Sequence, residues 1–160
     1  MDELPLDKFY EKMEWNAIPD DICEMIFEYL KTSVEPIRDN YPWQAAGHGQ
    51  FQMHDAPDFL WEWCQENIPL NFNEYCVSVQ MIPTHHCRTH VDTGLRNSSF
   101  NFVLTDDQAV TSWYDETKEN ILHSVQYKAK TWYHHQGAVF HRITGVLTPP
   151  RVAVTIYKII

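Results

Sequence analysis

The side chains best suited to chemistry are histidines, and they are concentrated in the second half of the chain. Seven of the nine histidines lie between residues 85 and 141. Imidazole is both the commonest metal ligand and a general acid or base near neutral pH. A use for imidazole side chains is therefore expected in this half of the chain.

A histidine and an aspartate stand two residues apart in "RTHVDTGLR", residues 88–96. Side chains alternate along an extended segment, so His90 and Asp92 project from the same side and can converge on one ion. Such a pair is only a fragment of a metal site, and a turn that carries ordinary polar residues is the alternative.

A third ligand is offered by His141, which stands within the otherwise apolar run "AVFHRI". A polar ring in an apolar strand needs a partner, either a hydrogen bond within the core or a metal. Two histidines and one carboxylate form the facial triad of non-haem Fe(II) oxygenases, which leaves positions on the metal open for substrates and oxygen. His90, Asp92 and His141 are therefore the candidate metal ligands and catalytic residues.

Arg151 opens the last apolar run, "RVAVTIYKI", ten residues after His141. If "TGVLTPP" closes a hairpin between the two runs, the guanidinium lies beside the histidine on an adjacent strand. A buried arginine needs an anionic partner, and its planar fork binds a carboxylate through two parallel hydrogen bonds. A carboxylate-bearing co-substrate next to the metal is the expected partner, and an ordinary acidic side chain is the alternative.

The HxD pair His90 and Asp92, the distal His141, and Arg151 ten residues later resemble the signature of the Fe(II)/2-oxoglutarate-dependent oxygenase superfamily. The resemblance covers roughly residues 74–160. It implies that His90, Asp92 and His141 hold Fe(II), and that 2-oxoglutarate chelates the metal with its far carboxylate on Arg151. It also implies that O2 drives oxidative decarboxylation of 2-oxoglutarate to succinate and CO2, coupled to hydroxylation of a substrate. The compact chain is similar to small bacterial and viral oxygenases.

The remaining pocket candidates follow from strand alternation and from position near the triad. Many relatives of this superfamily carry serine or threonine two residues after the arginine, where this chain has Ala153, so Thr155 is expected to substitute. Gln80, Asn101 and Thr155 are predicted co-substrate residues, and Arg96, Trp113 and Tyr114 are predicted substrate residues. The adjacent pairs His85, His86 and His134, His135 point to opposite faces of their strands, so neither pair can chelate one ion, and surface or rim positions are expected for most of these histidines.

The elements that must position these residues are two helices followed by short strands. Helical spacing of apolar residues predicts a helix from Asp20, its N-cap, towards Pro36, and a second in "DAPDFLWEWCQEN", residues 55–67, with Asp55 as its cap. A short strand at His90 joins seven further predicted strands, which are "YCVSVQMI", "SSFNFVL", "AVTSWY", "LHSVQYK", "TWYHH", "AVFHRI" and "RVAVTIYKI".

This order of elements predicts a mainly β (α+β) chain folded as a double-stranded β-helix, the cupin-like jelly roll, with supporting N-terminal helices. A Greek-key sandwich is the structural alternative. A chain of 160 residues is the size of one domain. We expect a single domain over residues 1–160, with helical support in 1–73 and the β core in 74–160.

Charge and composition restrict the partners. The formal net charge is −10, with 15 acidic against 4 basic residues in 1–67, and no cluster of lysine and arginine marks a surface for phosphate backbones. Nucleic acid and membrane partners are disfavoured. The four cysteines form no CxxC pair and the N-terminus does not resemble a signal peptide, so a cytoplasmic location is expected.

Three functions therefore remain open from the sequence. The first is an Fe(II)/2-oxoglutarate dioxygenase that hydroxylates a peptide or amino-acid side chain or a small molecule. The second is a cupin-like metal-dependent dioxygenase or isomerase that does not use 2-oxoglutarate. The third is a non-enzymatic β-sandwich binding module with incidental histidines. Oligomeric state is not predicted.

Overall fold

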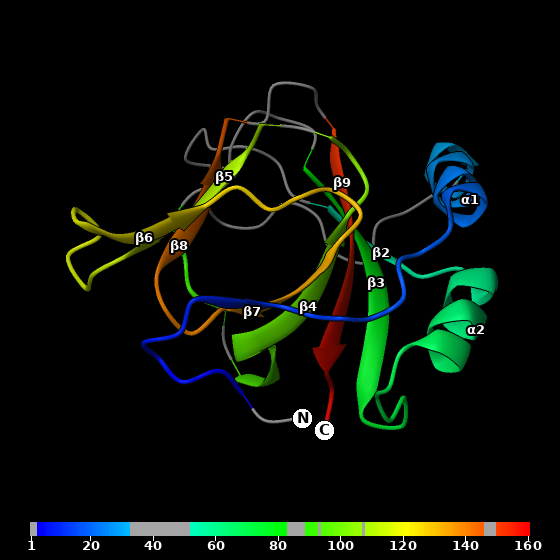
Figure 1. Ribbon diagram of the computed structural model, residues 1–160, viewed down its shortest axis with the longest axis horizontal. Helices are drawn as coiled ribbons and strands as arrows, with labels where there is room; N and C mark the ends of the chain where they lie inside the picture. The colour runs from blue at the N-terminus through cyan, green and yellow to red at the C-terminus, as the bar shows by residue number, and fades with distance from the viewer. Residues whose placement is uncertain (1–2, 33–51, 83–88, 93, 107, 146–149) are drawn as a thin grey trace.

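The computed structural model describes residues 3–32, 52–82, 89–92, 94–106, 108–145 and 150–160, without the side chains of Gln52, Leu95 and Arg96. Two antiparallel sheets face each other, and two helices lie along one flank (Figure 1). In chain order the elements are β1 (Tyr10–Lys12), α1 (Asp20–Thr32), β2 (Gln52–Asp55), α2 (Asp58–Asn67), β3 (Tyr75–Ile82), the 3-10 helix η2 (Gly94–Asn97), β4 (Ser98–Val103), β5 (Val110–Tyr114), β6 (Ile121–Val125), β7 (Trp132–Gln136), β8 (His141–Thr144) and β9 (Arg151–Lys158).

The strands divide into a six-stranded sheet, ordered β1-β7-β4-β9-β3-β2, and a three-stranded sheet, ordered β6-β5-β8. The inner faces of the two sheets meet through ring contacts. The ring of His135 on β7 lies 5.4 Å from that of Trp113 on β5 and 4.8 Å from that of His141 on β8. The sheets therefore enclose an interior that is lined by aromatic and imidazole rings.

The outer face of the large sheet packs on the helices, as the alternation predicts. Val152, Val154 and Ile156 of β9 are fully buried there, together with Ile26 of α1 and Leu60 of α2. The alternate residues of β9 are left for the inner face, because strand side chains point to opposite sides in turn. The predicted division of β4 is also confirmed, since Phe100 and Phe102 belong to the core under the helices.

Both predicted helices are present. The prediction that Asp20 is the N-cap of α1 is wrong, because the amide of Cys23 donates to the carbonyl of Pro19 and Asp20 is the first helical residue. Asp20 and Asp21 lie in the first turn of α1 and Lys31 in its last turn, where these charges favour the helix dipole. The prediction that Asp55 caps α2 is wrong, because Asp55 pairs with Ser78 as the end of β2 and α2 begins after Pro57. In the described part of the chain no helix is long and apolar enough to cross a membrane.

Two edge strands of the large sheet come from the N-terminal region, for which the sequence predicted only helices. β1 pairs with β7, opposite His135, and β2 pairs with β3. The two strands have three and four residues, too few for a recognisable alternation. The short strand predicted at His90 is a single bridge to His141.

The prediction of surface or rim positions is wrong for His134 and His135. β7 lies between β1 and β4, so all five of its residues are buried. The ring of His134 stacks on Phe100 at 4.2 Å and bonds to the Ser98 hydroxyl, while His135 faces the interior between the sheets. The predicted opposite orientation of the two rings is confirmed. His85 and His86 lie outside the described residues.

The burial of His134 gives stability a pH dependence. Burial lowers the pKa of His134 from 6.5 to about 4. A histidine whose pKa is lower in the folded than in the unfolded chain stabilises the fold above the unfolded value and loses this contribution as the pH falls. We expect the free energy of unfolding to decrease as the pH is lowered from 6.5 towards 4, as urea denaturation at several pH values would measure.

The slope of the unfolding free energy against pH measures how many protons the chain takes up when it unfolds, and His134→Gln should reduce this number by up to about one. Part of the slope should remain, because burial also lowers the pKa of His135 and His141. His123→Gln, on an exposed position of β6, is the matched control for the loss of an imidazole. Equal slopes for wild type and His134→Gln would contradict the assignment.

Candidate metal centre

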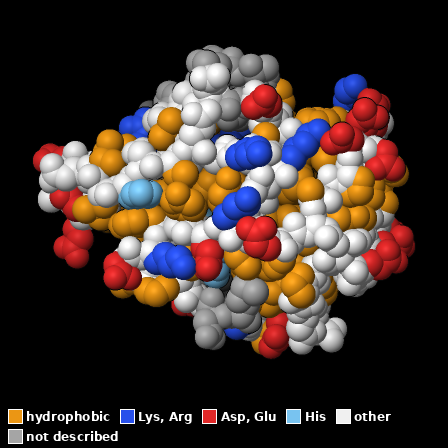
Figure 2. All heavy atoms as spheres, viewed as in Figure 1, with side chains coloured by type: hydrophobic (Ala, Val, Ile, Leu, Met, Phe, Trp, Pro, Cys, Tyr) orange, Lys and Arg blue, Asp and Glu red, His pale blue; other side chains and the backbone are white. Residues whose placement is uncertain are grey.

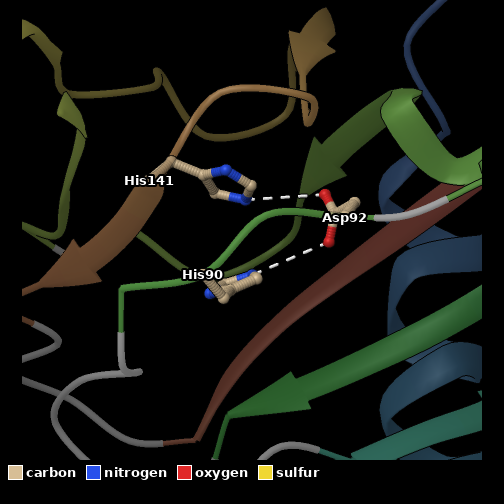
Figure 3. Close-up of side chains that lie close together, drawn as sticks. All are labelled: His90, Asp92 and His141. Carbon is tan, nitrogen blue, oxygen red and sulfur yellow. Dashed lines mark ion pairs between the residues drawn. The ribbon is translucent and has the colours of Figure 1, made fainter. Parts of the chain in front are cut away.

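The side chains of the three predicted metal ligands converge on one another (Figure 3). The carboxylate of Asp92 faces both imidazoles, with Oδ1 3.7 Å from His90 Nε2 and Oδ2 3.5 Å from His141 Nε2. One donor atom from each residue lies within 4.8 Å of the others. The three donors are therefore close enough to share one ion.

Main-chain hydrogen bonds bring the two parts of the triad together. The amide of His90 donates to the carbonyl of His141 at 2.9 Å, and the amide of His141 donates back at 2.8 Å. The amide of Asp92 donates to the carbonyl of Gly137 at 2.8 Å. Gly94 then takes a φ of +63°, which favours glycine and lets the chain turn into η2. The HxD segment is thus fixed against β8 and the loop before it.

The protonation of His141 suits a ligand. Its Nδ1 donates to the carbonyl of Val139 at 2.7 Å, which leaves the lone pair of Nε2 facing Asp92. Burial lowers the pKa of His141 to about 4, and the Asp92 carboxylate opposes this shift only in part. The ring is neutral at neutral pH, so its lone pair is available without the loss of a proton.

The donor set therefore fits a divalent transition metal such as Fe(II). The side chain of His141 is only 4% exposed, whereas those of His90 and Asp92 are 23% and 30% exposed. The site is buried on the β8 side and accessible on the side of the HxD segment. An ion held there would keep open positions that a second molecule can reach.

Arg151 lies at the start of β9 and is buried, at 6% exposure. The predicted hairpin with His141 is wrong, since β9 belongs to the large sheet and β8 to the small one. His141 and Arg151 therefore belong to different sheets and are not strand neighbours. Burial raises the pKa of Tyr127, and the positive charge of Arg151 offsets part of this rise. Burial also lowers the pKa of His135, and the Arg151 charge adds to that decrease. The guanidinium therefore acts on groups inside the sandwich.

Two of the predicted co-substrate residues are brought together on neighbouring strands. Thr155 Oγ1 donates to Asn101 Oδ1 at 2.7 Å, and Asn101 Nδ2 donates to Ser99 Oγ at 3.2 Å. Gln80 lies on β3 opposite Ala153 and is partly exposed. These residues form the polar part of the inner face of the large sheet, and their role in binding an acid stays a prediction.

The three predicted substrate residues lie in different surroundings in the structure. Trp113 is fully buried and its indole N–H donates to the carbonyl of Gln136 at 2.8 Å, which is a packing position within the interior. Tyr114 is partly buried at the end of β5, where the register against β6 shifts. The backbone of Arg96 is part of η2, and its side chain lies outside the described atoms.

Sequence reasoning missed three interior residues, Tyr127, Tyr133 and His135. The Tyr127 hydroxyl lies 3.0 Å from His135 Nδ1, and the two tyrosine rings stack at 4.5 Å. The alternation in "TWYHH" could have placed Tyr133 and His135 on one face, opposite Asn101 and Ser99 of β4, but it gives no signal for Tyr127.

Comparison with solved structures supports the architecture. A prolyl-4-hydroxylase from Pseudomonas putida superposes with a TM-score of 0.56 at 12% identity, over 93% of this chain and 91% of that one. The fold is a cupin-like jelly roll. The predicted fold class is thus confirmed over the Greek-key alternative.

The oxalate decarboxylase from Bacillus subtilis is also similar, with a TM-score of 0.46 at 13% identity over 79% of this chain. This chain spans 28% of the length of that decarboxylase. The sequence matches no protein-family model and no curated protein. At 12% and 13% sequence identity, these similarities show a shared fold and nothing further.

The triad can be tested through metal binding alone. Wild-type protein should bind one Mn(II) or Fe(II) ion per chain. His141→Ala should weaken this binding by at least about 100-fold, because mutation of a residue that only hydrogen-bonds to a metal ligand already lowers metal affinity about 10–100-fold. Anaerobic calorimetric titration measures this affinity. His123→Ala removes an imidazole outside the triad and should bind as wild type does. Equal affinity in both variants would place the metal elsewhere.

Proposed function

We propose that the protein is an Fe(II)- and 2-oxoglutarate-dependent dioxygenase that hydroxylates its substrate. The observation that carries this proposal is the buried cation Arg151, which shares the interior of the sandwich with His90, Asp92 and His141. A metal triad alone would suit many cupin-like enzymes. A buried guanidinium in the same interior adds a site for a carboxylate, as a 2-oxo acid with a second acidic end requires.

The charges of the site suit such an acid. Two neutral histidines and one carboxylate leave a bound Fe(II) with a net charge of +1, so a dianionic chelator reverses the sign. Arg151 offsets the negative end that is far from the metal. Buried charges are tolerated when they are paired, so the acid and the arginine stabilise each other inside the protein.

The side chains of this protein bind, orient and exclude water. Bound iron and O2 supply the oxidation of 2-oxoglutarate to succinate and CO2 and the oxygen atom that is added to the substrate. Val139 holds the His141 ring in the tautomer that keeps Nε2 free for a metal. Thr155 and Asn101 offer further polar contacts on the same inner face of the large sheet as Arg151, and the fully buried Trp113 keeps water from the interior.

The accessible side at His90 and Asp92 is where we expect the substrate to approach. A peptide or amino-acid side chain, or a small molecule, fits this protein better than nucleic acid does. On the face seen in Figure 2, lysine and arginine are interspersed with aspartate and glutamate, and the net charge is −10. The prolyl-4-hydroxylase with the similar fold is named for a peptide residue, which favours a peptide substrate here. Free thiols at Cys23, Cys64 and Cys76 favour a cytoplasmic location.

Arg151 decides between this function and its alternatives. Anaerobic addition of 2-oxoglutarate to the Fe(II)-loaded protein should give a visible charge-transfer band. Arg151→Ala should weaken 2-oxoglutarate binding about 30- to 1,000-fold, because it leaves a buried carboxylate unpaired. Titration of the band measures this affinity. Arg142→Ala is the matched control, since Arg142 alternates with His141 on β8 and points to its other face.

Other outcomes favour the other functions. Metal-dependent turnover that is independent of 2-oxoglutarate and survives Arg151→Ala would indicate a cupin-like enzyme without this co-substrate. A wild-type protein that binds no metal would indicate a binding module.

A further inference from the structure

A buried tyrosine–histidine pair lies in the interior besides the triad and Arg151. Tyr127, between β6 and β7, and His135 on β7 are 9% and 7% exposed. The Tyr127 hydroxyl lies 3.0 Å from His135 Nδ1. Within the part of the chain that the structure describes, this is the single hydrogen bond of the His135 ring.

The pair lies close to the metal triad and is within the influence of the arginine charge. The ring of His135 meets that of His141 edge to face, with centroids 4.8 Å apart. The charge of Arg151 also acts to lower the pKa of both Tyr127 and His135. An acid that joined the metal to Arg151 would therefore lie near these two side chains.

Packing fixes the orientation of the pair. The ring of Tyr127 stacks on Tyr133 at 4.5 Å, and the ring of His135 lies 5.4 Å from the fully buried Trp113. A neutral imidazole has one donor and one acceptor nitrogen. When the Tyr127 hydroxyl donates to Nδ1 of His135, the proton of the ring is on Nε2. His135 Nε2 is then a donor whose position the protein has set in advance.

We propose that Tyr127 and His135 form one wall of the acid pocket, and that His135, oriented by Tyr127, donates a hydrogen bond from Nε2 to the bound acid. The proposal rests on the proposed function for the identity of that acid. It assigns binding of the co-substrate to three groups: the metal at one end, Arg151 at the other, and the His135 donor between them. The competing role is structural, in which the pair only supports the ring of His141.

Three substitutions separate these roles. His135→Phe keeps a ring but removes both nitrogens. His135→Gln keeps an N–H donor near the position of Nε2. Tyr127→Phe removes one oxygen and keeps the stacking on Tyr133, so it tests the pair even if the His135 variants fail to fold. Thermal unfolding establishes which variants are folded.

The measurement is the affinity of the Mn(II)-loaded protein for 2-oxoglutarate, by anaerobic calorimetry, with the Mn(II) affinity determined separately. A hydrogen bond to a charged group corresponds to about 10- to 100-fold in affinity. We expect a loss of this size in His135→Phe, a loss of about 3- to 10-fold in Tyr127→Phe, and recovery to within about 3-fold of wild type in His135→Gln. The Mn(II) affinity should be unchanged in all three.

Two patterns would overturn this inference and leave the proposed function standing. Unchanged 2-oxoglutarate affinity in His135→Phe and Tyr127→Phe would show that the pair does not contact the acid. A lower Mn(II) affinity with normal 2-oxoglutarate affinity would assign the pair to support of His141. If the Mn(II)-loaded wild type binds no 2-oxoglutarate, the proposed function itself fails and this inference fails with it.

Discussion

The site depends on one pair of main-chain hydrogen bonds, between His90 and His141. These residues are 51 positions apart, and His141 begins β8, whereas His90 lies outside the named strands and forms a single bridge. The reciprocal bonds at 2.9 and 2.8 Å hold the HxD segment against β8, so the two imidazoles lie next to each other, with ring centroids 4.4 Å apart. The amide of Asp92 is bonded to the carbonyl of Gly137, which holds the backbone of Asp92 beside the loop that precedes β8.

The second constraint is the alternation along β9. The same strand places Val152, Val154 and Ile156 under the helices and leaves Arg151 and Thr155 for the interior. Burial of the apolar face stabilises the fold and, in doing so, places a cation where water is scarce. The helices therefore contribute to the chemistry indirectly, since the strand that they cover cannot turn over without exposing its valines.

Much of this arrangement could be predicted from the sequence, because it follows from alternation and spacing. The convergence of His90 with Asp92, the separate faces of β4 and β9, and the two amphipathic helices are local properties. The burial of His134 and His135 could not be predicted, since it depends on β1, a three-residue strand from the other end of the chain. Arg151 was assigned to the wrong neighbour for a similar reason: alternation fixes the face of a residue, and only the topology fixes its sheet. Tyr127 lies outside any strand, so no periodicity marks it.

The central claim is that one acid spans from the triad to Arg151. Diffraction from crystals grown with Mn(II) and 2-oxoglutarate without oxygen tests it most directly, because the metal is located by its anomalous signal and the acid by its density. The account predicts an anomalous peak between His90, Asp92 and His141, with the far carboxylate of 2-oxoglutarate on the Arg151 guanidinium. A metal bound elsewhere, or an acid that does not contact Arg151, would contradict it.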